Sequence, residues 1–272
     1  MPEFVCATCG VQHATSDEPP PICRICEDER QWVPEQGQQW TTLEELRVAH
    51  TNRVEQEGEP GLTGVGTEPS FAIGQRALLV QAEAGNVLWD CVTLVDDETV
   101  AAVERLGGVS AIAISHPHYY SSLVEWSRAF GGVPVHLHAA DREWVMRPDG
   151  CIAFWEGETL ELGPGLTLVR CGGHFEGGTV LHWAAGAEGR GALLSADIVQ
   201  VIPDRGWVSF MYSYPNLIPL PAAAIRHIGA ALEPFDFERI YGAWWDRIVG
   251  EDGKAAVRRS AERYVDWISR EA

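Results

Sequence analysis

The sequence predicts an α/β protein with layered sheets, preceded by a small metal-binding unit. From residue 71 onward, short apolar runs that suit buried strands alternate with stretches of helical apolar spacing. Apolar residues make up 46% of the 272-residue chain and charged residues 22%, a composition that can bury a full core. Closely spaced cysteine pairs near the start of the chain indicate a metal site of their own.

Residues 1–40 are predicted to form a module around a structural zinc ion. Its ligands are two Cys-x-x-Cys pairs separated by thirteen residues: Cys6, Cys9, Cys23 and Cys26. Four thiolates complete a tetrahedral shell, and the metal replaces a core that so short a segment cannot build. A redox dithiol or a disulfide is the alternative. His13 is interpreted as an exposed loop residue, because four cysteines need no further ligand.

Residues 41–70 are predicted to hold one short helix and otherwise a linker. Thr41 or Thr42 can cap a helix that begins at Leu43. Residues 50–70 are rich in Gly, Glu and Thr and have little apolar periodicity, which is typical of a linker or surface loop.

The main domain is predicted over residues 71–272. Its expected strands are short apolar runs: 77–80, 86–89, 109–115, 133–138, 159–162, 166–170, 180–183 and 192–195. Its expected helices follow acidic first turns or show 3.6-residue spacing: 96–106, 122–130, 221–232 and 254–269. The last helix is interpreted as a salt-bridged surface helix, with a homo-oligomer contact as the second interpretation.

The charge balance excludes several classes of partner. Lys and Arg number 20 against 39 Asp and Glu, which gives a formal net charge of −19. An acidic chain repels phosphates and anionic lipids, so neither nucleic acid nor a membrane surface is an expected partner. The sequence holds no apolar run of about 18 residues and no secretory leader, so a reducing, cytoplasmic location is expected. The expected partner is a small-molecule substrate.

Four potential metal ligands follow predicted strands. His116 and His118 come directly after one strand, His174 lies in a Gly-rich turn after another, and Asp197 ends a third. Loops at strand ends commonly carry catalytic groups, and imidazole and carboxylate ligands suit zinc or iron.

These residues resemble the motifs of the metallo-β-lactamase superfamily. His116 and His118 match the first two ligands of the family's His-x-His-x-Asp-His motif, His174 matches the third ligand, and Asp197 matches the acid that usually bridges two metals. Asp90 matches an acid that supports the site without binding metal. The resemblance implies a four-layer αββα sandwich, to which the four-cysteine module is an N-terminal addition.

The second metal site of the family is degenerate in this chain. Tyr120 and Ser121 stand where the family has Asp and His, and the segment 240–246 lacks the family's last His. The resemblance therefore implies a single ion, zinc or iron, held by the three histidines with Asp197.

The implied activity is that of a mononuclear metallohydrolase acting on a small ester, thioester, lactone or related substrate. Metal-bound water would attack, with Asp197 as base or orienting group and Tyr120 donating to the developing oxyanion. Two alternatives stay open. His116, His174 and Asp197 also match the two-His-one-carboxylate set of iron oxygenases, as in persulfide dioxygenases, and a catalytically inactive member could bind a ligand or partner.

Other notable residues are interpreted as structural. His182 alternates with apolar residues on a predicted strand, and Cys171 is expected to be buried and inert. Tyr212 and Tyr214 belong to an aromatic cluster that is expected to be mostly core, with some members lining a substrate pocket.

Overall fold

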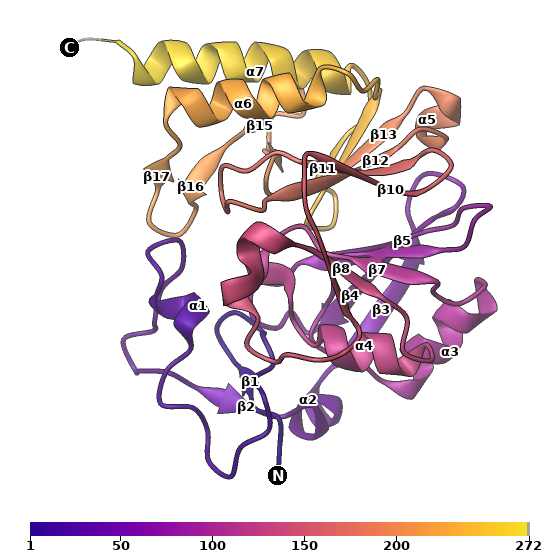
Figure 1. Cartoon of the computed structure of the whole chain (residues 1–272), viewed down its shortest axis with the longest axis vertical. Helices are drawn as coiled ribbons and strands as arrows, with labels where there is room; N and C mark the ends of the chain where they lie inside the picture. The colour runs from indigo at the N-terminus through magenta and orange to yellow at the C-terminus, as the bar shows by residue number, and fades with distance from the viewer. Residues whose placement is uncertain (271–272) are drawn as a thin grey trace. The chain divides into compact units, whose positions relative to one another are not determined.

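The computed structural model describes residues 1–270, which divide into two compact units (Figure 1). Unit 1 comprises residues 1–137 and 141–154, and unit 2 comprises residues 138–140 and the chain from Trp155 onward. Each unit has one large sheet and helices of its own, as the predicted α/β class requires. Residues 271 and 272, the end of the predicted main domain, lie outside the described residues.

Unit 1 is built on a seven-stranded sheet of order β3-β4-β5-β6-β7-β8-β9. The strands are β3 (Thr51–Gln56), β4 (Leu62–Glu68), β5 (Arg76–Val80), β6 (Val87–Trp89), β7 (Ala111–Ala113), β8 (Val135–His138) and β9 (Ile152–Trp155). Strands β3 to β6 pair antiparallel, whereas β6, β7 and β8 pair parallel. The carboxyl ends of β6 and β7 therefore meet at one edge, where Asp90 and His116 follow them.

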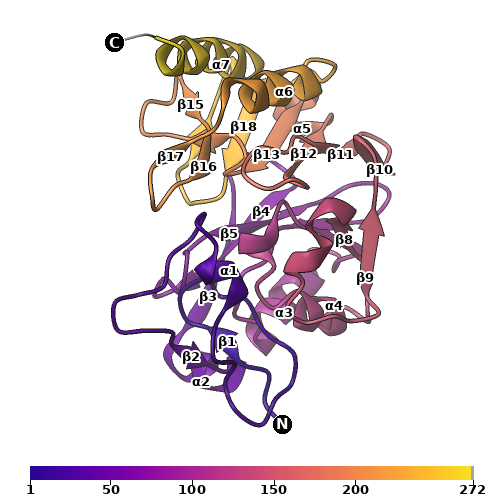
Figure 2. The same ribbon diagram turned by 60° about the vertical axis from the view of Figure 1, so that its left-hand side comes forward.

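Besides this sheet, unit 1 contains several helices and an N-terminal two-stranded ribbon. They are β1 (Val5–Cys6), α1 (Arg24–Glu27), β2 (Trp40–Thr41), α2 (Leu43–Ala49), α3 (Asp97–Arg105), η1 (Pro117–Tyr119), α4 (Leu123–Ala129) and η2 (Ala139–Trp144). Strands β1 and β2 pair antiparallel within the indigo segment of Figure 2. Thr42 caps α2 as predicted, and Glu45 completes a capping box with it.

The linker interpretation is wrong for residues 51–68, which form β3 and β4. Leu62 and Val65 are fully buried in β4, but Gly64 and Gly66 interrupt its apolar alternation. The side chains of β3 are exposed or half-buried, so that strand carries no apolar stripe. Strand β3 pairs with β4, and β4 pairs with β5, where Leu62 lies opposite Val80. No local pattern in the sequence reports these pairings.

Unit 2 is built on a six-stranded sheet of order β10-β11-β12-β13-β18-β19. The strands are β10 (Thr159–Gly163), β11 (Leu166–Arg170), β12 (Thr179–Trp183), β13 (Ala192–Ala196), β18 (Arg239–Gly242) and β19 (Ile248–Val249). Only the β13–β18 pair is parallel within this sheet. Two small ribbons add β14 (Gln200–Val201) with β15 (Val208–Ser209), and β16 (Met211–Ser213) with β17 (Ile218–Pro219).

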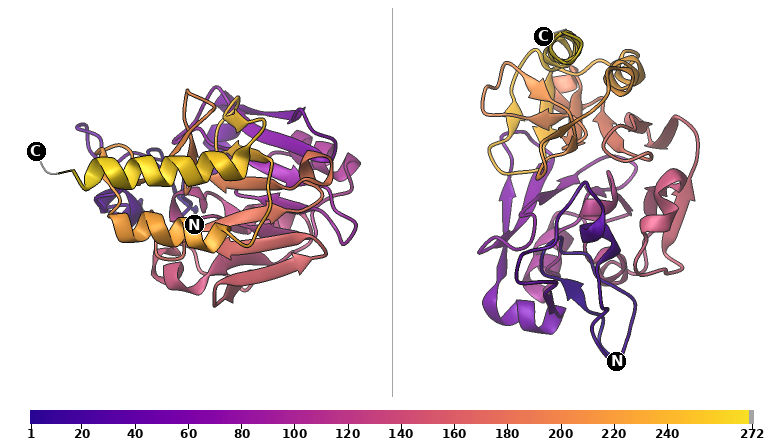
Figure 3. Two further views of the ribbon diagram at one scale, coloured as in Figure 1. Left: turned by 90° about the horizontal axis from the view of Figure 1, so that it is seen from above. Right: turned by 90° about the vertical axis from the view of Figure 1, so that its left-hand side faces the viewer.

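The core of unit 2 lies between this sheet and two long helices. The helices of the unit are α5 (Gly186–Gly189), α6 (Ala222–Leu232) and α7 (Gly253–Ile268). Helices α6 and α7 lie side by side in both views of Figure 3. Ile225 and Ile228 of α6 and Val257 of α7 pack in one buried cluster with Val169 and Leu193 of the sheet. Among residues 1–270, no helix is both long and apolar enough to cross a membrane.

Candidate metal centres

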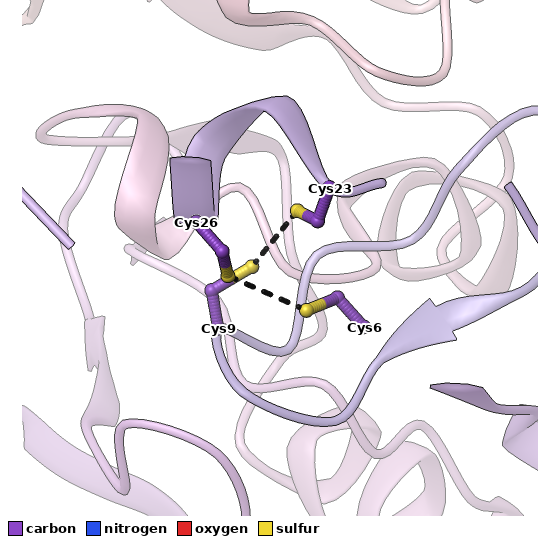
Figure 4. A group of neighbouring side chains, drawn as sticks. All are labelled: Cys6, Cys9, Cys23 and Cys26. Atoms are coloured by element: carbon purple, nitrogen blue, oxygen red, sulfur yellow. Dashed lines mark hydrogen bonds between the residues drawn. The ribbon is translucent and has the colours of Figure 1, made fainter. Parts of the chain in front are cut away.

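The four cysteines of the N-terminal module form one buried cluster in unit 1 (Figure 4). The Sγ atoms of Cys6 and Cys26 are 3.5 Å apart, those of Cys9 and Cys23 are 3.7 Å apart, and all four lie within 4.8 Å of one another. A disulfide needs about 2.05 Å between sulfurs. Thiolates at bonds of about 2.3 Å to a tetrahedral ion would be roughly 3.8 Å apart, so the cluster fits a single zinc-like ion.

Polar contacts favour the charged form of Cys6 and Cys23, whereas burial raises the pKa of Cys9 well above its usual range. Gln38 donates from Nε2 to Cys6 Sγ over 3.0 Å. Hydrogen bonds from the neighbouring thiols, that of Cys26 first, hold the pKa of Cys23 well below its usual range, and His13 adds a smaller contribution. Such contacts to ligand atoms are typical of metal sites.

His13 and Gln38 hydrogen-bond to thiols of the cysteine cluster, and neither contact was predicted from the sequence. His13 is 8% exposed and packs edge-on against the Trp40 ring with centroids 4.7 Å apart, so its interpretation as an exposed loop residue is wrong. Gln38 lies 32 residues from Cys6 and carries no motif that would have indicated the contact.

In unit 1, Asp90 and His116 are connected through Ser115 at the edge where β6 and β7 end. Asp90 Oδ1 accepts hydrogen bonds from Ser115 N and from Ser115 Oγ, each of 2.8 Å. Ser115 Oγ is also 2.9 Å from His116 Nδ1. Because the hydroxyl proton points to the carboxylate, Ser115 Oγ accepts from Nδ1–H of His116. This assignment from the network leaves the lone pair of His116 on Nε2, the form in which imidazole binds a metal.

His118 completes a pair of buried imidazoles on the same loop. It lies in η1, and its ring centroid is 5.2 Å from that of His116 with the planes at 74°. His116 is 1% exposed and His118 is 4% exposed. Burial of two imidazoles on one loop is costly unless each has a polar or metal partner.

Tyr120 and Ser121 contact the backbone of unit 1. The Tyr120 hydroxyl is 3.5 Å from the Asp141 carbonyl oxygen, and burial raises the pKa of this tyrosine well above its usual range, so the group stays neutral. Ser121 Oγ donates to the Cys91 carbonyl oxygen over 3.1 Å. The predicted role of Tyr120 at an oxyanion stays a prediction.

In unit 2, a tight Gly-rich turn after β11 positions His174. Gly172 and Gly173 have φ of +64° and +83°, and a Cβ at Gly178 would lie 2.7 Å from the Gly172 carbonyl oxygen. His174 Nδ1 donates to the Tyr212 carbonyl oxygen over 2.7 Å. The lone pair of His174 is therefore on Nε2, as for His116, and its ring is 1% exposed.

Asp197 follows β13 and is 5% exposed. Its carbonyl oxygen accepts from the Tyr214 hydroxyl over 2.6 Å, and the Tyr214 ring lies 5.6 Å from the His174 ring. Tyr212 thus fixes the ring of His174 through its carbonyl oxygen, and Tyr214 fixes the backbone of Asp197 through its hydroxyl. The sequence predicted both tyrosines only as members of an aromatic cluster.

Two residues interpreted as structural have the expected surroundings. His182 Nε2 bonds to the Asp236 carbonyl oxygen over 2.8 Å, and burial lowers its pKa. Cys171 is fully buried, and burial raises the pKa of its thiol to about 12. A thiol with this pKa is no nucleophile at neutral pH.

Comparison with known proteins places the chain in a family. The chain is 52% identical to the protein YmaE of Bacillus subtilis (strain 168) over 272 residues, which cover 100% of this chain and 98% of YmaE. This chain belongs to the YmaE family. No family model matches its sequence.

Solved structures show the fold of this YmaE-family protein. VMB-1 superposes with a TM-score of 0.61 at 10% identity, over 80% of this chain and 98% of VMB-1. The DIM-1 metallo-β-lactamase gives 0.59 at 14% identity over 80% and 98%, and the metallo-β-lactamase SMB-1 gives 0.51 at 18% identity over 79% and 98%. The fold is that of the metallo-β-lactamases, so the fold that the motif resemblance implied is confirmed.

Proposed function

We propose that this protein is a metal-dependent hydrolase with one catalytic ion, whose ligands are His116, His118, His174 and Asp197. The observation that carries the proposal is the tautomer of two buried histidines. Nδ1 of His116 and Nδ1 of His174 each face an oxygen acceptor, at 2.9 Å and 2.7 Å. Metal-binding histidines almost always donate the second ring N–H in this way, because the acceptor fixes the ring and makes Nε2 a better ligand.

The donor set fits zinc or iron. Neutral imidazole nitrogens suit both ions, and one carboxylate is a common additional ligand. A zinc ion so bound would lower the pKa of a coordinated water toward about 7 and polarise the substrate carbonyl.

The residues of the chain supply orientation and proton transfer. Asp90 and Ser115 fix the ring of His116. Asp197, held at its carbonyl by Tyr214, is the base that accepts a proton from the attacking water and returns it to the leaving group. The neutral hydroxyl of Tyr120 is the proposed donor to the oxyanion.

We propose a small ester, thioester or lactone as the substrate. The net charge of −19 disfavours long polyanions, because their phosphates would be repelled. The seven cysteines are free thiols, which suits a reducing compartment, and we propose the cytoplasm. The four-cysteine cluster is proposed to hold a structural zinc ion, since four thiolates leave no open position for chemistry.

A hydrolysis panel tests the activity. Zinc-loaded protein is assayed on p-nitrophenyl acetate, an acyl-thioester and a lactone, alongside His174→Ala. The matched control is His136→Ala, which replaces a half-buried histidine of β8. We expect hydrolysis of at least one substrate, loss of at least 10²-fold in His174→Ala and wild-type rates in His136→Ala. Equal rates in wild type and His174→Ala would contradict the proposal. Oxygen uptake with a thiol substrate by iron-loaded protein would instead support the oxygenase alternative.

A further inference from the structure

We infer that the four-cysteine module (residues 1–40) positions the loops that carry Asp90, His116 and His118, so that Gln12 and Thr93 are positioning residues for the catalytic metal. This inference rests on the proposed function. The module makes two hydrogen bonds to these loops, one three residues after Asp90 and the other three residues after His118. The fold of the sheet does not require either contact, because both come from the N-terminal module.

The first contact joins Gly10 to Thr93. Thr93 Oγ1 donates to the Gly10 carbonyl oxygen over 2.9 Å. Gly10 directly follows Cys9 and has φ of +81°, and a Cβ at this position would lie 2.4 Å from Thr93 Oγ1. The Cys6–Cys9 turn is therefore hydrogen-bonded, through Gly10, to the segment that continues from Asp90. Ser122 Oγ donates to the Thr93 carbonyl oxygen over 2.6 Å, which connects that segment to residues 115–122, the histidine loop that carries His116 and His118.

The second contact joins Gln12 to Ser121. The Gln12 backbone N–H donates to the Ser121 carbonyl oxygen over 2.9 Å. Ser121 has φ of +45°, a backbone conformation that a residue with a Cβ keeps only when its surroundings impose it. Gln75 Nε2 contributes by donating to Ser121 Oγ over 3.1 Å. The module thus supplies one of the contacts that hold the end of the histidine loop in its strained form.

A nearly buried arginine extends this connection to α4, the helix that follows the loop. Arg147 donates to Gln12 Oε1, pairs with Glu125 of α4 at 2.7 Å, and pairs with Glu3 at 3.3 Å. Its side chain is 9% exposed, so solvent screens these charges weakly. Gln12 therefore contacts the histidine loop directly and α4 through Arg147.

The backbone of Cys6 holds Gly10 and Val11, and Gln12 directly follows them. Gly10 N–H donates to the Cys6 carbonyl oxygen over 2.8 Å, and Cys6 N–H donates to the Val11 carbonyl oxygen over 3.0 Å. This short turn has little core of its own, so an ion bound by the cluster would supply its rigidity. The spacing of the four cysteines predicts a structural role for the module, and these contacts direct that role to the histidine loop.

Cobalt titration of the full-length protein tests the inference. Metal-free protein is titrated with Co²⁺. Co²⁺ at the cysteine site gives a thiolate charge-transfer band. Co²⁺ at the histidine site gives d–d bands with no charge-transfer band. The variants are Thr93→Val, which removes the bond to Gly10, and Gln12→Pro, which removes the N–H donor to Ser121. Thr67→Val is the control for the first, because it removes a 2.9 Å hydrogen bond to Asn52 in the same unit. Gln12→Ala is the control for the second, because it keeps the backbone N–H.

We expect Thr93→Val and Gln12→Pro to keep the thiolate band and to weaken Co²⁺ binding at the histidine site by about tenfold, the effect of losing an outer contact to a ligand. Their d–d bands should also shift, whereas Thr67→Val matches wild type and Gln12→Ala loses less affinity than Gln12→Pro. Unchanged histidine-site affinity and spectrum in both test variants would overturn the inference and leave the proposed function standing. A wild-type protein that binds Co²⁺ only at the thiolates would overturn both.

Discussion

Replacing Ser115 with Ala should both weaken binding of the catalytic metal and destabilise the fold. The hydroxyl of Ser115 donates to Asp90 Oδ1 at 2.8 Å and accepts from His116 Nδ1 at 2.9 Å, and all three residues are at most 2% exposed. A bond to a carboxylate contributes about 1.5–3 kcal/mol and a neutral bond about 0.5–1.5 kcal/mol, so the free energy of unfolding should fall by about 2–4.5 kcal/mol. Without its acceptor, the His116 ring can rotate or change tautomer, and the affinity for metal should fall by about 10- to 100-fold.

The assay for Ser115→Ala is competition for Zn²⁺ with a chromophoric chelator, together with urea unfolding of the metal-free protein. Ser127→Ala is the control, because Ser127 is also fully buried in unit 1 and donates to the Val133 carbonyl oxygen over 2.6 Å. It should lose about 1 kcal/mol of stability and keep its metal affinity. Ser115→Thr should restore binding. Wild-type zinc affinity at the histidine site in Ser115→Ala would refute the role assigned to this serine.

Three further predictions each concern a single residue. Tyr214→Phe removes the 2.6 Å bond to the Asp197 carbonyl oxygen, so urea unfolding should show a loss of about 1 kcal/mol; an unchanged midpoint would contradict this. Gly10→Ala puts a Cβ 2.4 Å from Thr93 Oγ1 at a positive φ, and denaturant unfolding should show a loss of at least about 2 kcal/mol, in contrast to Gly37→Ala, where the positive φ adds strain but no atom is close. Burial raises the pKa of Cys171 from 9 to about 12, so the folded state favours the protonated thiol. The contribution of this thiol to the free energy of unfolding is complete below pH 9 and is lost as the pH rises from 9 toward 12. Cys171→Ala should therefore flatten the alkaline limb of a curve of stability against pH.

The sequence predicted those parts of the site that depend on local spacing. The cysteine pairs and the His116–His118 pair are short motifs, and their chemistry can be inferred from the residue types alone. Most strands and helices of the main domain were also predicted, because each has its own apolar run or its own cap. For example, α2 begins at a capping box formed by Thr42 and Glu45, which are near neighbours in the sequence.

The parts that the sequence did not predict depend on contacts between distant segments. His174 takes its tautomer from a carbonyl 38 residues away, and the module reaches the histidine loop through Gln12 and Ser121. The strand β4 has two glycines in place of apolar residues and is stabilised by its pairing with β5. No periodicity in the chain reports any of these contacts.

The metal content of the purified protein tests the central claim most directly. Elemental analysis counts ions per chain in the wild type and in the His116→Ala/His118→Ala double variant. We predict two metal ions in the wild type, one at the four cysteines and one at the histidines, and one ion in the double variant. A single ion in both proteins would contradict the catalytic centre and leave only the cysteine site.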